Sequence, residues 1–157
     1  MERHPVPYGQ LPVWFVLEEF AALGHMRSIE TAAGYMAGYG VKLWTILQDL
    51  TQLKTHYPKS WETFLGNAGI IQAFGTVDAT TNEYLSKLLG QTTISEVQKT
   101  RVTSRGMAEG DTGSRENLRS LSLLDAAEIS YYFARETGRQ MIISPGRPPI
   151  YIDRLKA

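Results

Sequence analysis

A short apolar run that ends in two carboxylates constrains the fold more than any other feature of this chain. Val13–Leu17, with the sequence VWFVL, is followed directly by Glu18 and Glu19. So short and bulky a run is typical of a strand buried on both faces, as in the middle of a parallel sheet. Ligands of open α/β sheets bind beyond the carboxyl ends of the strands, so Glu18 and Glu19 are expected at a ligand-binding edge. A solvated strand end is the alternative reading.

Further apolar runs follow at intervals that helices can fill. Residues 41–47 form a second run that ends on Gln48, and a helix capped by Ser28 is predicted before it. Asp49 can cap the next short helix, and residues 70–74 form a third run. This alternation predicts an α/β protein with a mostly parallel sheet and right-handed crossovers. Because parallel strands end at the same edge, Gln48 is expected near the two carboxylates.

The chain divides into four segments. Residues 1–12 carry three prolines and are expected to form an irregular lead-in, and residues 13–98 hold the predicted strands and helices. Residues 99–120 are rich in glycine and arginine and are expected to form a mobile loop or insertion. Residues 121–157 are predicted to form a helix and then a β-hairpin around the turn SPGRPP. Five aromatic residues in apolar stretches are expected in the core: Trp14, Tyr35, Trp44, Phe64 and Phe74.

Composition excludes several classes of protein. A chain of 157 residues with 43% apolar content is long enough for one domain with a sizeable core. Its 16 basic and 16 acidic residues cancel, so no field of one sign indicates a nucleic acid or an anionic membrane as partner. Absence of cysteine excludes thiolate metal sites, disulfides and thiol catalysis. No apolar run reaches the roughly 20 residues that span a bilayer, so the chain is expected to be soluble.

The acidic strand end is the feature most able to carry chemistry. His4, His25 and His56 lack the spacing of a metal site, and no G-x-S-x-G motif is present. Nucleotide hydrolysis with Mg²⁺ needs one carboxylate for the metal's water shell and a second group for the attacking water. Two adjacent carboxylates at a strand end, with the amide of Gln48 after the next strand, could supply these groups.

Three segments resemble, in the same order, the TraG/TraD-type coupling proteins of conjugation and type IV secretion. They are WFVLEEFAALGHM, GYMAGYGVKLWTILQDLTQLKTHY and FLGNAGIIQAFGTVDATTNEYLSKLLGQTT. The resemblance runs over residues 12–97 and resumes over residues 123–155. Members of this family are membrane-anchored, RecA-like hexameric ATPases at the cytoplasmic face of the bacterial inner membrane. The resemblance therefore implies a partial RecA-like P-loop NTPase fold, with residues 13–98 as the C-terminal half of the ATPase core and residues 121–157 completing it.

The resemblance also implies roles for individual residues. It makes LEEF the Walker B strand, with Glu18 contacting Mg²⁺ through water and Glu19 as the catalytic base. Gln48 would read the γ-phosphate. ATP and Mg²⁺ are the cofactors implied for the complete protein. Its implied partners are relaxosome proteins, DNA, the secretion channel and further copies of itself in a homo-hexamer.

Three departures from the family pattern affect these expectations. Glu18 stands where the family usually has aspartate, and the longer side chain alters a metal geometry that Mg²⁺ keeps strict. Ala37 stands where some relatives have an arginine that reaches across the subunit interface. No G-x-x-x-x-G-K-[ST] motif occurs, so the chain lacks a cradle for phosphates and is expected to be inactive and to bind no nucleotide tightly alone.

Three interpretations of the chain remain open. It can be a fragment of a coupling ATPase, with the P-loop, membrane helices and an inserted all-α domain expected on a segment before the Walker B strand. It can be a non-catalytic docking module that recognises a relaxosome accessory protein through exposed apolar surface. It can also be an inactive remnant, because a RecA-like sheet cut in half leaves an open strand edge.

Overall fold

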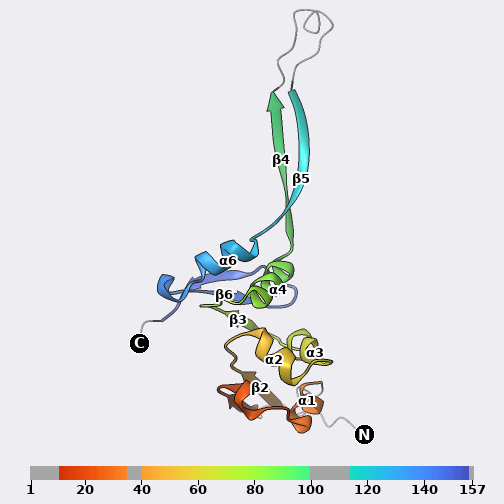
Figure 1. Ribbon diagram of the computed structural model, residues 1–157, viewed down its shortest axis with the longest axis vertical. Helices are drawn as coiled ribbons and strands as arrows, with labels where there is room; N and C mark the ends of the chain where they lie inside the picture. The colour runs from red at the N-terminus through yellow and green to blue at the C-terminus, as the bar shows by residue number, and fades with distance from the viewer. Residues whose placement is uncertain (1–10, 35–39, 100–113, 156–157) are drawn as a thin grey trace, which may run out of the picture.

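The computed structural model describes residues 11–34, 40–99 and 114–155, and Figure 1 shows them as three parts in a row. The first part holds two strands and three helices: β1 (Val13–Leu17), α1 (Arg27–Ala33), β2 (Val41–Thr45), α2 (Leu50–His56) and α3 (Trp61–Gly66). The central part holds three strands and two helices: β3 (Ile71–Ala73), α4 (Ala79–Leu89), α6 (Ala126–Tyr132), β6 (Arg139–Ile143) and β7 (Ile150–Asp153). From the central part projects a ribbon of two strands, β4 (Gln91–Lys99) and β5 (Ser114–Ser122).

Strands β1 and β2 form the parallel pair that the sequence predicts. Their register runs from Val13 opposite Val41 to Leu17 opposite Thr45. Helix α1 lies between them in the chain, as expected for a parallel connection. The α1 helix begins after Met26, so Ser28 lies inside its first turn and is not its N-cap.

The prediction that β1 is buried on both faces is wrong. Trp14 is 55% exposed and Phe15 is 50% exposed, and Trp44 on β2 is 49% exposed. Within the part of the chain that the structure describes, β1 pairs with β2 alone, and this two-stranded sheet leaves much of its surface uncovered. Of the other aromatic residues expected in the core, Phe64 is partly buried, Phe74 is 45% exposed, and Tyr35 lies outside the described residues.

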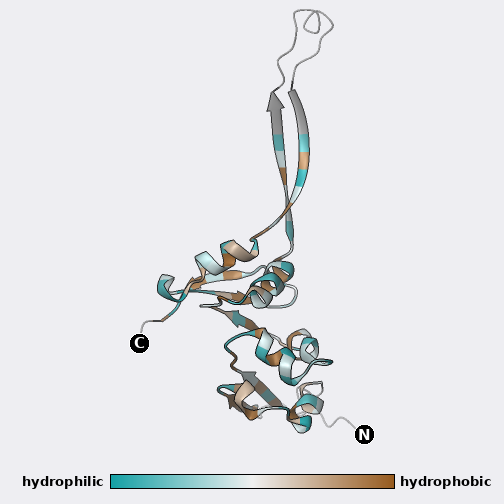
Figure 2. Cartoon of the chain, in the orientation of Figure 1, coloured by the Kyte–Doolittle hydropathy of each residue, from teal (hydrophilic) through white to brown (hydrophobic). Residues whose placement is uncertain are grey.

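A mostly parallel sheet is also not found, although the α/β class holds. Strands β3, β6 and β7 form an antiparallel sheet in the order β3-β6-β7. The β6–β7 pair is the C-terminal hairpin predicted around SPGRPP, because a short turn can join only antiparallel neighbours. Figure 2 shows hydrophobic residues along β3 and β6, where this sheet packs against the buried side chains of Leu85, Ile129 and Phe133.

The prediction of a loop over residues 99–120 is wrong for the residues that belong to the β4–β5 ribbon. Residues 114–120 belong to β5, which pairs with β4 in unbroken antiparallel register from Gln91 opposite Ser122 to Lys99 opposite Ser114. Residues 100–113 lie outside the described part of the chain. Polar residues dominate both strands and mimic a loop, but paired backbone groups form a ladder whatever the side chains are.

Two clusters of buried side chains stabilise the two larger parts. The first joins η1 (Phe20–Leu23) to α2 through Phe20, Leu50, Leu53 and Tyr57. The second joins α4, α6 and β6 through Leu85, Ile129, Phe133 and Met141. Both sets show helical spacing, i to i+3 or i+4, which puts one face of each helix inward. Within residues 11–34, 40–99 and 114–155, no helix has the length and apolar character needed to cross a bilayer.

Aspartates cap three of the helices. Asp49 accepts a hydrogen bond from the Gln52 backbone N–H at 2.8 Å, as predicted, and caps α2. Asp125 forms a reciprocal capping box with Glu128 at the start of α6. Helix α4 is capped by Asp78, whose carboxylate accepts hydrogen bonds from both the backbone N–H and the hydroxyl of Thr81.

Replacing Asp78 with alanine is expected to weaken the fold in a pH-dependent way. Partial burial of Asp78 acts to raise its pKa, but hydrogen bonds from Thr81, Thr51 and Thr80 together outweigh burial and hold the pKa below its usual value. The stabilisation is therefore complete above pH 4 and is lost as the pH falls through the lowered pKa. Urea unfolding at pH 7 should show a loss of about 1 kcal/mol, and the difference should shrink at pH 2–3.

Glu83→Ala is the matched control for this cap. Glu83 lies exposed on the same helix, and no hydrogen bond to the helix start involves it within the described residues. Its replacement should change the free energy of unfolding by less than about 0.5 kcal/mol. An equal loss in both variants would show that Asp78 does not act as a cap.

Candidate active site

The carboxyl ends of β1 and β2 lie side by side and form the candidate site. The Ile46 N–H donates to the Leu17 carbonyl, and the Phe20 N–H donates to the Ile46 carbonyl, both at 3.0 Å. These two bonds extend the pairing beyond the last residues of the strands. Glu18 and Glu19 occupy the turn between the bonded residues, and both side chains are exposed. The turn therefore presents two carboxylates at the edge where ligands of parallel sheets bind.

Glu19 has a strained backbone. Its φ of 50° and ψ of 45° are left-handed, and no other non-glycine residue of the described part has a positive φ. This conformation costs about 1–2 kcal/mol for a residue with a side chain. Such strain persists only where the surroundings hold it, and it is concentrated at functional sites.

Phe20 holds the strained turn in place. Its side chain is fully buried and stacks on Tyr57, with ring centroids 5.6 Å apart and planes within 9° of parallel. Phe64 packs against the same ring at 5.7 Å. The buried ring and the Phe20 N–H bond together fix the residue that follows Glu19. The buried Phe20 therefore fixes the backbone of the turn that carries the two carboxylates.

Gln48 lies at the same edge, two residues after Ile46. It precedes Asp49 and the start of α2, and its side chain is exposed. The Gln52 amide donates a weak 3.5 Å hydrogen bond to the Gln48 Oε1, and the Gln48 NH₂ group has no hydrogen-bond partner among residues 11–34, 40–99 and 114–155. The structure therefore brings Glu18, Glu19 and Gln48 to one edge, as the parallel pairing predicts.

The donor set at this edge fits Mg²⁺ bound with a nucleotide. Mg²⁺ usually binds through one or two carboxylates, several waters and substrate phosphates, and does not require a cage of protein ligands. No group of three or more His, Cys, Asp or Glu side chains suited to a metal occurs within the described residues. Glu18 and Glu19 can thus hold a metal's water shell, but the phosphates need further groups. Ala37 lies outside the described residues.

The histidines form no metal site in the described residues. The His25 Nε2 lies 2.9 Å from a Glu30 oxygen, and the Ser60 hydroxyl donates to the other oxygen. These hydrogen bonds, the one from Ser60 first, lower the pKa of Glu30. The cluster joins α1 to the start of α3. His4 lies outside the described part, and His56 lies in the last turn of α2, where a positive charge is favourable.

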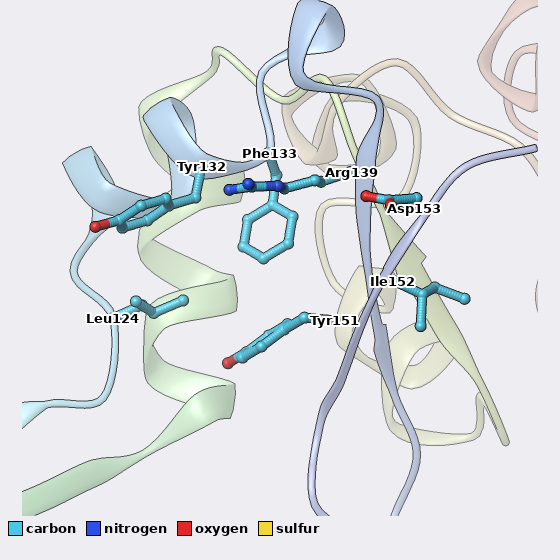
Figure 3. Close-up of a pocket in the computed structure, with 7 residues that line it drawn as sticks. All are labelled: Leu124, Tyr132, Phe133, Arg139, Tyr151, Ile152 and Asp153. Atoms are coloured by element: carbon cyan, nitrogen blue, oxygen red, sulfur yellow. The ribbon is translucent and has the colours of Figure 1, made fainter. Parts of the chain in front are cut away.

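A second concave site, missed at the sequence level, lies between α6 and the β6–β7 hairpin. It is a hollow of about 340 Å³ lined by aromatic, aliphatic and charged side chains (Figure 3): Leu124, Tyr132, Phe133, Arg139, Tyr151, Ile152 and Asp153. Burial raises the pKa of the Tyr151 hydroxyl, which keeps it neutral. The sequence feature that could have indicated this site is the aromatic run YYF at residues 131–133. Helical spacing from Ile129 to Phe133 turns Phe133 inward and leaves Tyr132 at the side of the helix.

Sequence comparisons connect the chain to conjugation proteins. A family model described as "TraM recognition site of TraD and TraG" matches residues 12–131. Protein VirD4 of Rhizobium radiobacter is 30% identical over 146 residues, which cover 92% of this chain and 20% of VirD4. Conjugal transfer protein TraG of Escherichia coli is 34% identical over 105 residues, which cover 65% of this chain and 16% of TraG. The chain spans about a fifth of the length of these relatives.

Solved structures share the fold at low sequence identity. The bacterial conjugative coupling protein TrwBdeltaN70 superposes with a TM-score of 0.73 and 19% identity, covering 97% of this chain and 33% of TrwB. TrwB in complex with the non-hydrolysable ATP analogue ADPNP gives a TM-score of 0.69 at 18% identity, with 97% and 32% covered. This match confirms the expected α/β, partial RecA-like fold. With the family model over residues 12–131, it shows that the chain belongs to the TraG/TraD coupling-protein family, in the region described as the TraM recognition site.

Proposed function

We propose that this chain is the Walker B-containing segment of a coupling ATPase that transfers DNA or protein in conjugation or type IV secretion. The observation that carries the proposal is the edge formed by Glu18, Glu19 and Gln48 beyond the parallel strands β1 and β2. Exposed apolar side chains on both strands support it, since parallel strands are normally covered on both faces. A further polypeptide segment would cover these strands and supply the phosphate cradle.

Each residue of the edge has a distinct role in this proposal. Bound Mg²⁺ would neutralise the developing charge on the phosphates. Glu18 would accept hydrogen bonds from the metal's water shell, and Glu19 would take the proton of the attacking water. Gln48 would donate from its amide to a γ-phosphate oxygen. The TrwB complexes with ADPNP, and with ADP and Mg²⁺, support ATP and Mg²⁺ as the cofactors of the complete protein.

A chimera tests this proposal. In it, the chain replaces the matched region of VirD4 from Rhizobium radiobacter, to which it is 30% identical. We expect the chimera to hydrolyse ATP with Mg²⁺ and to lose that activity with EDTA. The chain alone should hydrolyse none, because its 157 residues contain no P-loop motif. A chimera that binds nucleotide but does not hydrolyse it, or a chain that is active alone, would refute the assignment.

A second candidate function is docking of a relaxosome accessory protein without catalysis. It is favoured by the description of the matching family model, which names a TraM recognition site over residues 12–131. The expected result is retention of a TraM-type protein on the immobilised chain at physiological salt. Absence of specific retention would remove this candidate. In both cases the complete protein would act as a homo-hexamer at the cytoplasmic face of the inner membrane, between the relaxosome and the secretion channel.

A further inference from the structure

We propose that the hollow between α6 and the β6–β7 hairpin, named here the aromatic pocket, binds one nucleotide unit of single-stranded DNA. Its residues are Leu124, Tyr132, Phe133, Arg139, Tyr151, Ile152 and Asp153. The proposal deepens the function proposed above by assigning a site to the DNA. Its test does not depend on ATP hydrolysis, so either proposal can fail without the other.

The walls of the pocket suit a planar, partly apolar group. Phe133 is buried at its base, and the Tyr151 ring lies against it with ring centroids 5.4 Å apart at an angle of 49°. Tyr132 and Tyr151 remain 41% and 46% exposed, and in Figure 3 they border the same hollow from α6 and from β7. Exposed rings of this kind are the platforms on which bases stack, and every base has a face to offer them.

Two opposite charges border the pocket without neutralising each other. Arg139 on β6 and Asp153 on β7 are directly opposed in the strand register. Nevertheless, the ion pairs found among the described residues are His25–Glu30 and Glu96–Arg119. Arg139 is therefore available for an anion, and Asp153 for a donor such as an exocyclic amine. A nucleotide carries a phosphate and, in adenine, cytosine and guanine, such an amine, so it matches both charges.

A second arginine, Arg154, follows Asp153 in the chain but is engaged outside the pocket. The Arg154 N–H donates to the Gly138 carbonyl at 2.6 Å, which places Arg154 beside the residue that precedes Arg139. The Arg154 guanidinium lies 4.8 Å over the Phe74 ring and donates to the Arg135 carbonyl. Its Nε is buried and has no hydrogen-bond partner. These contacts already engage the guanidinium, and its Nε is shielded from solvent, so Arg139 is the cation of the pocket that an incoming phosphate can reach.

These observations favour a strand over a free nucleotide. The pocket offers a single cation, Arg139, which is a weak anchor for a triphosphate, whereas a strand gains further affinity from bases that stack on the exposed tyrosine rings. Aromatic rings next to a cationic group are typical of surfaces that bind single strands. Duplex DNA keeps its bases stacked inside and cannot place one between Tyr132 and Tyr151.

Fluorescence anisotropy of the full chain with labelled oligodeoxycytidylate, without ATP, tests the proposal. Tyr151→Ala and Tyr132→Ala should each weaken binding by about 5- to 150-fold, the range for loss of one stacked base, while Tyr151→Phe keeps the affinity. Arg139→Gln should weaken binding and lower the slope of log K against log salt by about 0.7. Trp44→Ala, an exposed aromatic residue on β2, and Arg147→Gln, in the β6–β7 turn, are matched controls that should bind as the wild type does.

The exocyclic amine gives a second readout. Oligodeoxycytidylate has the amine that Asp153 would accept from and oligothymidylate lacks it, so the wild type should prefer the former about two- to tenfold. Asp153→Ala should abolish this preference, because alanine has no acceptor for the amine, with the fold verified by circular dichroism. The proposal is overturned if the strand does not bind, if the controls lose affinity equally, or if duplex DNA or dCMP competes as well as the strand. It is also overturned if the tyrosine variants lose only binding of a protein partner.

Discussion

Replacing Glu19 with glutamine in the VirD4 chimera is expected to slow ATP hydrolysis by about 10²–10⁴-fold. Glutamine keeps the size and hydrogen-bonding reach of the side chain but cannot take a proton. Binding of nucleotide and Mg²⁺ should be nearly unchanged, because in the proposed site Glu18 holds the metal's water shell. The measurement is single-turnover hydrolysis at saturating ATP, together with the affinity for a non-hydrolysable analogue.

Two further variants separate the role of Glu19 from its effect on the backbone. Glu19 has a φ of 50°, and asparagine tolerates this left-handed conformation well. Glu19→Asn should therefore fold at least as stably as the wild type and still lose turnover. Glu18→Gln should instead raise the Mg²⁺ concentration needed for half-maximal activity. Unchanged turnover in both Glu19 variants would show that another group deprotonates the water.

Replacing Phe20 with alanine is expected to lower the free energy of unfolding by about 3–5 kcal/mol. The ring is fully buried, stacked on Tyr57 and in contact with Phe64, so its loss removes apolar burial and leaves a cavity. Phe20 also follows Glu19 directly, so the same change should release the strained turn. Urea unfolding of the chain measures the loss.

Val77→Ala is the control for Phe20. Val77 is 86% exposed, so its truncation should change stability by less than about 0.5 kcal/mol. The contact between the two rings also predicts that the effects of Tyr57→Ala and Phe20→Ala on the free energy of unfolding are not additive, because each change removes part of the same stack. A loss below about 1 kcal/mol for Phe20→Ala would mean that this cluster does not support the edge.

Short sequence patterns predicted those strands, helix starts and turns that are determined by residues close together in the chain. The apolar runs located β1 and β2, Asp49 marked the start of α2, and SPGRPP marked the turn between β6 and β7. Burial of β1 could not be predicted in this way, because burial depends on which elements cover a strand and not on its own residues. The exposed Trp14 and Trp44 show that difference.

Features that depend on distant partners escaped prediction. Residues 92–97 alternate in the way that predicts an edge strand, and β4 confirms it, but its partner β5 is a polar strand whose sequence resembles a loop. The start of α4 was predicted wrongly for a local reason, because Thr80 with Glu83 fits a capping-box pattern but the N-cap is Asp78, two residues earlier. The aromatic pocket joins Tyr132 on α6 to Tyr151 on β7, and only the folded hairpin brings them together. The common location of Glu18, Glu19 and Gln48 could be predicted from the sequence, because a single crossover brings their strands side by side.

A structure of the chimera bound to ADPNP and Mg²⁺ tests the central claim most directly. We predict that the Glu18 carboxylate accepts a hydrogen bond from a water of the metal's shell. The Glu19 carboxylate should lie within about 3.2 Å of the water in line with the γ-phosphate, with the Gln48 amide on a γ-phosphate oxygen. A metal held by other carboxylates, with Glu18 and Glu19 more than one water away from it, would contradict the assignment of this edge as the catalytic site.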